Sequence, residues 1–275
     1  MKCFDVKLKE EYALLGENGR DPVLSCYLPY NLEMMRGNKR PCMVVCPGGG
    51  YGTCSEREAE PIALKFLSMG FNVFVLYYSV SPHRYPVQLR EVAAVFEVIH
   101  KNAENWNCDT DKIGIIGFSA GGHLAAHYSN AYNCDEVRTV FTDSKKPAFD
   151  ILCYPVITAD EAFAHTGSFV NLLGSDPGDS ESKKLSCEKL VTSDTPPAFI
   201  WHTANDDVVS VKNSLCYAAA LADNKVPFSL HIYPYGDHGL ATCDGLTCNS
   251  DFLNEKSVLA YAWIEDFKKW FDITF

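Results

Sequence analysis

The chain has 275 residues, of which 47% are hydrophobic and 21% are charged, as in an ordinary globular protein. Its formal net charge of -11 argues against nucleic acid and anionic membranes as partners, because both bind basic surfaces. The N-terminus has no apolar run of signal-peptide length and no stretch is long enough for a membrane span, so we expect a cytoplasmic protein. A chain of this length is expected to fold as one domain over residues 1–275.

The chain alternates between predicted strands and predicted helices. Residues 1–30 are predicted to contribute antiparallel edge strands, of which Val23–Pro29 is the clearest. Short strand-like runs follow at Cys42–Cys46, Phe71–Tyr78, Lys112–Gly117, Ile151–Pro155, Ala198–Thr203 and Phe228–Tyr233. Helical segments separate them at Glu56–Met69, Val87–Asn102, Lys212–Asp223 and Leu253–Phe271. This order predicts βαβ units, and therefore a mostly parallel central sheet with helices on both faces.

A candidate nucleophile stands at the end of the strand that begins at Lys112. Gly117-Phe118-Ser119-Ala120-Gly121 has the form G-x-S-x-G, and the segment HLAAHYSN after it is compatible with a helix. This pattern predicts a sharp strand-to-helix turn, in which a strained backbone lifts the Ser119 hydroxyl out of the sheet. Ser119 would then lie at the carboxyl end of a central strand, where ligands of parallel sheets bind.

A serine becomes a strong nucleophile only when an imidazole accepts its proton and a carboxylate orients that imidazole. Asp206 and Asp207 follow the strand Ala198–Thr203, and His238 lies in a glycine-flanked loop after the strand Phe228–Tyr233. The order Ser, Asp, His is that expected for such a site. Other carboxylates combine a strand end and this order less well: Asp160, Glu161 and Asp237.

A reaction at Ser119 also needs donors for the oxyanion of its intermediate. The backbone N–H of Ala120 is one candidate, and the loop Gly48-Gly49-Gly50 brings further peptide N–H groups without side chains in the way. A phosphate-binding loop would need a G-x-x-x-x-G-K-[ST] or G-x-G-x-x-G motif, which is missing at this loop. Arg57 and Glu58 follow the loop and either hold it by a charged pair or begin a solvated helix.

The remaining histidines and the cysteines are interpreted as structural. His202 and His231 lie within predicted strands, as core or surface histidines do. His123 and His127 are four residues apart on a predicted helix, but the glutamate of H-E-x-x-H and a third ligand are missing, so packing is favoured over zinc. The twelve cysteines are scattered singly without a C-x-x-C pair, as buried reduced thiols are, for example Cys42, Cys46 and Cys153. We expect neither a metal nor a cofactor.

Five segments of the chain carry a family resemblance: CPGGGY, SEREAEPIA, GFSAGGHLAAH, the stretch YPVIT…NLLG…PPAFIWHTANDDVVSVKNS, and YPYGDHGL. Together they resemble the α/β-hydrolase superfamily. They are most similar to the bacterial esterase group related to hormone-sensitive-lipase-type carboxylesterases and to acetyl-xylan or feruloyl esterases.

The resemblance, which runs from Cys42 to His238, implies an α/β-hydrolase fold with Ser119 as nucleophile and His238 as general base. It implies Asp206 rather than Asp207 as the orienting acid, because the family pattern places the first aspartate in that position. The oxyanion donors that it implies are Gly49, Gly50 and Ala120. Two residues depart from the pattern, since Pro47 replaces the histidine of H-G-G-G and Ser210 replaces a proline.

These features predict a serine carboxylester hydrolase that forms an acyl-enzyme on a small-molecule ester. The resemblance implies short-chain acetyl esters of sugars or oligosaccharides as the substrate class. The alternatives are a peptidase or amidase with the same triad, and a non-catalytic binding protein on a hydrolase fold. Residues 155–197 are polar, turn-rich and too long for an ordinary connection, so we expect a small lid or flanking insertion there. The oligomeric state stays open, with a homo-oligomer among the options.

Overall fold

The computed structural model describes residues 1–12, 22–31, 37–160, 162–175, 180–249 and 257–275. The strands in this part of the chain are β1 Lys2–Lys7, β2 Val23–Leu28, β3 Arg40–Cys46, β4 Asn72–Tyr77, β5 Cys108–Phe118, β6 Phe149–Cys153, β7 Ala198–Thr203 and β8 Phe228–Tyr233. The α-helices are α1 Leu8–Glu11, α2 Glu60–Ser68, α3 Val87–Trp106, α4 Ala120–Ala131, α5 Asp135–Arg138, α6 Thr166–Leu173, α7 Ser180–Lys184, α8 Lys212–Asp223 and α9 Trp263–Thr274. The 3₁₀ helices are η3 Glu56–Glu58, η4 Cys187–Lys189 and η5 Ser257–Ala262.

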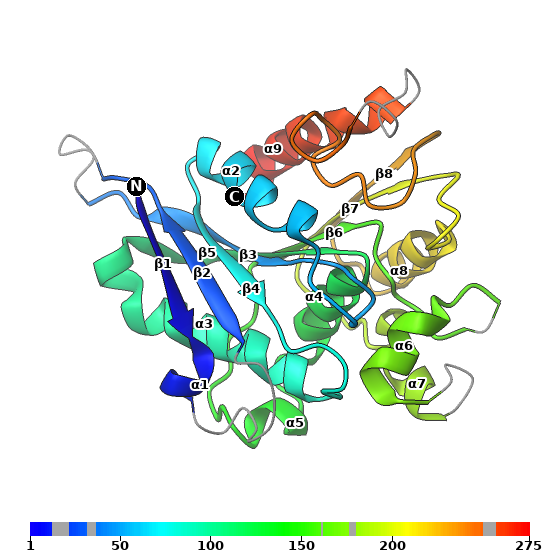
Figure 1. The fold of residues 1–275 in the computed structure, drawn as a ribbon, viewed down its shortest axis with the longest axis horizontal. Helices are drawn as coiled ribbons and strands as arrows, with labels where there is room; N and C mark the ends of the chain where they lie inside the picture. The colour runs from blue at the N-terminus through cyan, green and yellow to red at the C-terminus, as the bar shows by residue number, and fades with distance from the viewer. Residues whose placement is uncertain (13–21, 32–36, 161, 176–179, 250–256) are drawn as a thin grey trace.

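The strands form one sheet in the order β1-β2-β4-β3-β5-β6-β7-β8 (Figure 1). β2 is antiparallel to both β1 and β4, and every other neighbouring pair is parallel. The predicted mostly parallel sheet, with antiparallel strands from residues 1–30 at one edge, is confirmed.

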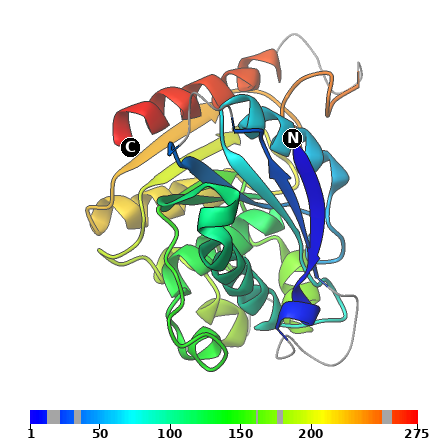
Figure 2. The same cartoon turned by 90° about the vertical axis from the view of Figure 1, so that its left-hand side faces the viewer.

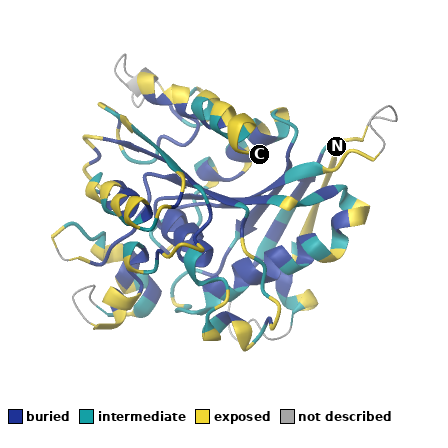
Figure 3. Cartoon of the chain, turned by 180° about the vertical axis from the view of Figure 1, so that it is seen from behind, coloured by how far each residue is buried: buried dark blue, intermediate teal, exposed yellow. Residues whose placement is uncertain are grey.

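Helices cover both faces of this sheet, as predicted. α2 and α9 lie on one face, and α3, α4 and α8 lie on the other (Figures 1 and 2). Successive strand residues point to opposite faces, so Val44 and Ile115 belong to the core beneath α3 and α4, whereas Val45 and Ile116 belong to the core beneath α2 and α9. The central strands of the sheet and the inner faces of the helices are therefore buried, whereas the edge strand β1 and the outer helix faces are exposed (Figure 3).

The connections after β3 and β5 determine where a ligand site forms. The chain leaves β3 through α2 toward β4 on one side, and it leaves β5 through α4 toward β6 on the other side and across the other face. In parallel sheets, ligands bind at the carboxyl ends of strands where the strand order reverses in this way. The glycine loop after β3 and the turn at Ser119 after β5 meet at this point.

Two predicted helices differ from the observed ones. The helix predicted over Glu56–Met69 is divided at Ala59, whose φ of -106° and ψ of -103° separate η3 from α2. Pro61 in the first turn of α2 explains the division, because proline has no N–H to continue a helix from the preceding turn. The helix predicted over Leu253–Phe271 is divided into η5 and α9, and its residues 253–256 lie outside the described residues.

One continuous sheet joins β1 to β8. Among the described helices, none combines the length and apolarity that a membrane span requires. The prediction of a single domain over residues 1–275 stays a prediction.

Asp150 on β6 places a carboxyl group in the core between α4 and α8. It is fully buried, and neither carboxyl oxygen has a hydrogen bond of good geometry among the described residues. Burial raises the pKa of Asp150 to about 8, against the opposing effect of the hydroxyls of Ser129 and Tyr217. Since an unfolded aspartate releases its proton near pH 4, the folded state binds one more proton than the unfolded state between about pH 4 and about pH 8.

Because of this extra proton, we expect the contribution of Asp150 to the free energy of unfolding to be greatest below about pH 4 and to be lost as the pH rises to about 8. The free energy of unfolding of the wild type should fall more steeply between pH 5 and pH 7 than that of Asp150→Asn, by on the order of 1 kcal/mol per pH unit. Urea denaturation at three pH values measures this slope, with the exposed Asp111→Asn as control. Equal slopes in the wild type and Asp150→Asn would contradict it.

Candidate active site

At Ser119 the chain turns sharply from β5 into α4. The φ of 52° and ψ of -119° of Ser119 lie in a region that L-residues rarely adopt. A Cβ atom on Gly117 would lie 2.1 Å from the carbonyl oxygen of Gly121, and one on Gly121 would lie 2.1 Å from that of Cys46. Only glycine fits at either position, so the predicted strand-to-helix turn is confirmed.

His238 is brought to this serine by the loop that follows β8. Its Nε2 atom lies 2.9 Å from Oγ of Ser119, although the two residues are 119 positions apart in sequence. The loop is anchored to the end of β7, because the Thr203 hydroxyl donates to the Gly236 carbonyl at 2.7 Å and the Gly236 N–H donates to Oδ1 of Asn205 at 2.8 Å. The loop that carries the imidazole is therefore fixed between the end of β8, which it follows, and the end of β7.

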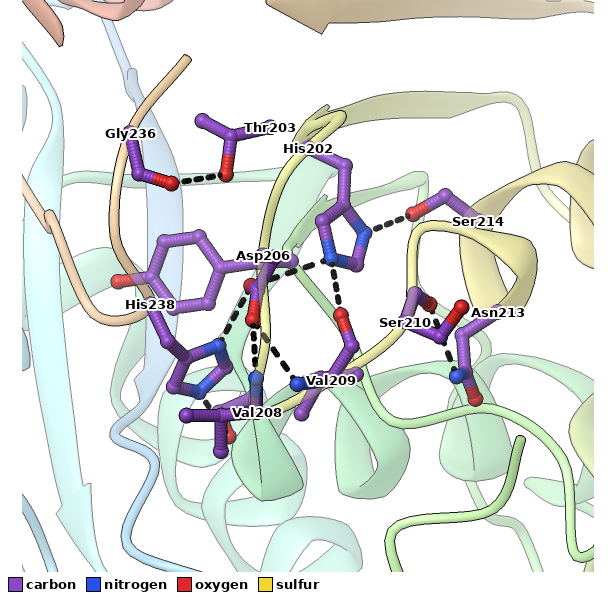
Figure 4. A network of polar contacts seen from close by, with 12 residues as sticks. His202, Thr203, Asp206, Val208, Val209, Ser210, Asn213, Ser214, Gly236 and His238 are labelled. Carbon is purple, nitrogen blue, oxygen red and sulfur yellow. Dashed lines mark hydrogen bonds and ion pairs between the residues drawn. The ribbon is translucent and has the colours of Figure 1, made fainter.

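Asp206 lies behind the imidazole. Its Oδ2 atom is 2.7 Å from Nδ1 of His238, and its Oδ1 accepts the N–H groups of Val208 and Val209 at 3.0 and 2.9 Å (Figure 4). Burial acts to raise the pKa of Asp206, but hydrogen bonds from His202 and His238 hold it well below its ordinary value. The carboxylate is therefore ionised and oriented by at least three donors.

The other carboxylates considered from the sequence lie elsewhere. Asp160, Asp207 and Asp237 are exposed, and none is hydrogen-bonded to His238 in the part of the chain that the structure describes. Glu161 lies outside the described residues. Of the described carboxylates, the structure brings Asp206 to the imidazole.

His202 supports the position of Asp206, a role that its predicted position within a strand did not indicate. Its Nε2 atom lies 2.9 Å from the Val209 carbonyl and 3.3 Å from Oδ2 of Asp206, and its Nδ1 lies 2.8 Å from the Ser214 hydroxyl (Figure 4). Because both neighbours of Nε2 are acceptors, this nitrogen carries the proton and Ser214 donates to Nδ1. His202 is fully buried and holds the Asp206 loop, whereas His231 on β8 is half-buried. The only sequence signal for this role is its position four residues before Asp206, where a strand ends.

The glycine loop lies against the serine. A Cβ atom on Gly48 would be 3.0 Å from Cβ of Ser119, and Gly49 and Gly50 have φ values of 122° and 62° that favour glycine. In the described segments, the N–H groups of Gly49, Gly50 and Ala120 have no hydrogen-bond acceptor. These three predicted donors are therefore available to a ligand.

Glu58 links the glycine loop to the loop that carries His238. It is buried, its Oε2 accepts the Gly48 N–H at 2.8 Å, and its Oε1 accepts the Tyr154 hydroxyl at 2.7 Å. The same hydroxyl accepts the Ala241 N–H at 3.0 Å, and the Tyr154 ring lies edge-on to that of His238 with centroids 5.0 Å apart. Glu58 thus holds the glycine loop through the Gly48 N–H, whereas the charged pair of Glu58 with Arg57 stays a prediction. The contacts of Tyr154 were not found from the sequence.

Arg57, the neighbour of Glu58, contacts the loop that carries His238. Its Nη1 donates to the Gly239 carbonyl at 3.0 Å, one residue after His238. Since Glu58 is only 4% exposed, the alternative in which these residues begin a solvated helix is wrong for Glu58.

The pair of histidines on α4 packs in the core, as predicted. His123 accepts the Tyr51 hydroxyl at Nδ1 and donates to the Leu185 carbonyl at Nε2, both at 2.8 Å, and His127 stacks on Tyr85. Burial lowers the pKa of His123 to about 4 and that of His127 to about 3, so both are uncharged at neutral pH. Across the described ranges, no group of three or more His, Cys, Asp or Glu residues is arranged to hold a metal ion.

Known proteins match this chain over most of its length. A family model described as BD-FAE matches residues 25–221. The endo-1,4-beta-xylanase B of Butyrivibrio fibrisolvens is 40% identical over 246 residues, which cover 86% of this chain and 37% of that protein. The acetylxylan esterase of Xylanibacter ruminicola is 34% identical over 232 residues, which cover 82% of this chain and 45% of that protein. The chain thus spans less than half the length of these two relatives.

A solved structure is similar over nearly the whole of both chains. The acetyl ester-xyloside bifunctional hydrolase from Caldicellulosiruptor lactoaceticus has a TM-score of 0.75 and 38% sequence identity, covering 91% of this chain and 90% of its own. Together with the strand order, this similarity confirms the predicted α/β-hydrolase fold.

Proposed function

Because the chain belongs to the BD-FAE family, we propose that it is a serine carboxylester hydrolase with Ser119 as nucleophile, His238 as general base and Asp206 as the acid that orients the base. The observation that carries this proposal is the pair of contacts through His238, 2.9 Å to the Ser119 hydroxyl and 2.7 Å to the Asp206 carboxylate. This geometry allows one imidazole to take the serine proton while the carboxylate fixes its tautomer and stabilises its cation.

In the first half of the reaction, Ser119 Oγ attacks the ester carbonyl carbon and its proton passes to Nε2 of His238. The carbonyl oxygen becomes an oxyanion, for which we assign the N–H groups of Gly49, Gly50 and Ala120 as donors. Collapse of this intermediate breaks the bond to the alcohol oxygen, which leaves with the proton from His238. An acyl-enzyme on Ser119 remains.

In the second half, water attacks the acyl carbonyl carbon while His238 accepts its proton. The same three N–H groups stabilise the second oxyanion. Cleavage of the bond to Ser119 Oγ returns the proton from His238 to the serine and releases the carboxylic acid. Each step is carried by side chains and backbone groups of this chain.

For the substrate, we propose short-chain esters, with acetyl groups on sugars or oligosaccharides as the preferred class. The support comes from two similar proteins, an acetylxylan esterase and an acetyl ester-xyloside bifunctional hydrolase. The cytoplasmic location, the homo-oligomer and the lid over residues 155–197 stay predictions.

The assignment of the nucleophile predicts that Ser119→Ala lowers kcat for p-nitrophenyl acetate by about a thousandfold or more, because the acyl-enzyme cannot form. Release of p-nitrophenolate measures the rate, and circular dichroism verifies the fold of the variant. The exposed Ser68→Ala on α2 serves as control and should retain wild-type activity. Hydrolysis by Ser119→Ala at the wild-type rate would exclude this serine as the nucleophile.

The assignment of Asp206 as the acid predicts that substitutions of the two neighbouring aspartates differ greatly in their effect on kcat. Asp206→Asn should lower kcat by about a thousandfold or more, because an amide at this position no longer holds the imidazole in the correct tautomer. Asp207→Asn, which changes an exposed side chain, should stay within about twofold of the wild type. If Asp207→Asn has the larger defect, the acid has been assigned to the wrong neighbour.

A further inference from the structure

One side of α6, together with the preceding residue His165, faces the glycine loop of the site. The Asn171 side-chain amide donates to the Gly50 carbonyl at 2.9 Å. A Cβ atom on Gly50 would lie 3.9 Å from Cε1 of His165 and 3.9 Å from Oγ of Ser168. Residues 165, 168 and 171 are three apart, so they share one side of the helix start. This side of α6 therefore lies over the loop that carries two of the proposed oxyanion donors.

One imidazole nitrogen of His165 has a partner and the other does not. Nδ1 is 2.8 Å from the Ser168 hydroxyl, and Ser168 is itself buried, so the ring orientation is fixed. Among the described residues, Nε2 of His165 makes no hydrogen bond. His165 is half-buried, so this nitrogen is a polar group without a protein partner close to the glycine loop.

The charges of the site also act on His165. Burial, followed by the charge of a protonated His238, lowers the pKa of His165, while the Asp206 carboxylate acts to raise it. His165 is therefore uncharged at neutral pH. It also lies within electrostatic range of both His238 and Asp206.

The position of His165 decides which part of a substrate it meets. The departing alcohol oxygen must lie near Nε2 of His238, because this atom supplies its proton. A group beside Gly50 and within electrostatic range of His238 can meet the alcohol part of the ester. A sugar hydroxyl both donates and accepts hydrogen bonds, so it can pair with either tautomer of His165.

We propose that His165 is a specificity-determining residue whose Nε2 hydrogen-bonds a hydroxyl group of the alcohol part of the substrate, next to the acylated oxygen. This inference rests on the function proposed above and extends it. It predicts that esters of polyhydroxylated alcohols are preferred over esters of simple alcohols, and it assigns this preference to Nε2 of His165.

The test compares acetylated xylobiose, which offers neighbouring hydroxyls, with p-nitrophenyl acetate, which offers none. A glutamine amide reaches the position of Nε2, whereas an asparagine amide reaches only that of Nδ1. His165→Asn should lower kcat/KM for acetylated xylobiose by about fivefold to tenfold through a higher KM, as expected for the loss of one hydrogen bond made before and during the reaction. His165→Gln should retain more than about half of the wild-type value, and both variants should hydrolyse p-nitrophenyl acetate within about twofold of the wild type.

His100→Asn is the matched control, because this histidine lies on α3 near Lys145 and Asp143, and it should leave both substrates unaffected. Equal losses with the two substrates in His165→Asn would overturn the inference and indicate a structural role. No loss with acetylated xylobiose, or an equal loss in His165→Gln and His165→Asn, would also overturn it. Failure of the proposed function is seen separately, because the wild type would then not hydrolyse p-nitrophenyl acetate.

Discussion

The close approach of two backbone segments at the end of β3 and β5 determines the rest of the site. Cys46 and Gly117 are paired neighbours in the sheet, and the chain after each of them must turn within the same small space. A side chain on Gly121 would come within 2.4 Å of the Pro47 carbonyl oxygen as well as colliding with Cys46. The absence of a side chain lets α4 begin directly beneath the glycine loop. The strained Ser119 and the free N–H groups of the loop therefore lie together.

The loops that follow β7 and β8 are held to this turn by buried polar contacts. His202 and two backbone N–H groups hold the Asp206 carboxylate, and Glu58 joins the glycine loop through Tyr154 to the loop of His238. Hydrogen bonds of this kind are strong in a buried environment and leave little freedom to the groups that they join. A site built in this way is organised before substrate arrives, which is the condition under which fixed dipoles stabilise a developing oxyanion.

The sequence predicted those parts of the site that depend on local backbone chemistry. The turn at Ser119 needs glycines at fixed positions, and Asp206 and His238 follow recognisable strands in a fixed order, so each has a local signal. The division of the helix at Ala59 also has a local signal, because Pro61 lies in the first turn of α2. Tyr154, His202 and His165 have no comparable signal, because their roles come from contacts between segments that are distant in sequence.

The central claim is that Ser119 is the nucleophile whose hydroxyl oxygen becomes covalently acylated. Reaction with a phosphonate ester tests this claim most directly. A p-nitrophenyl phosphonate reacts with an activated serine by forming an oxygen–phosphorus bond and releasing p-nitrophenolate, and the product is stable enough for peptide mass spectrometry. The account predicts a single label on the peptide that contains Ser119, with loss of esterase activity in proportion to labelling. A label on a different residue, or an active esterase that takes up no label at Ser119, would contradict it.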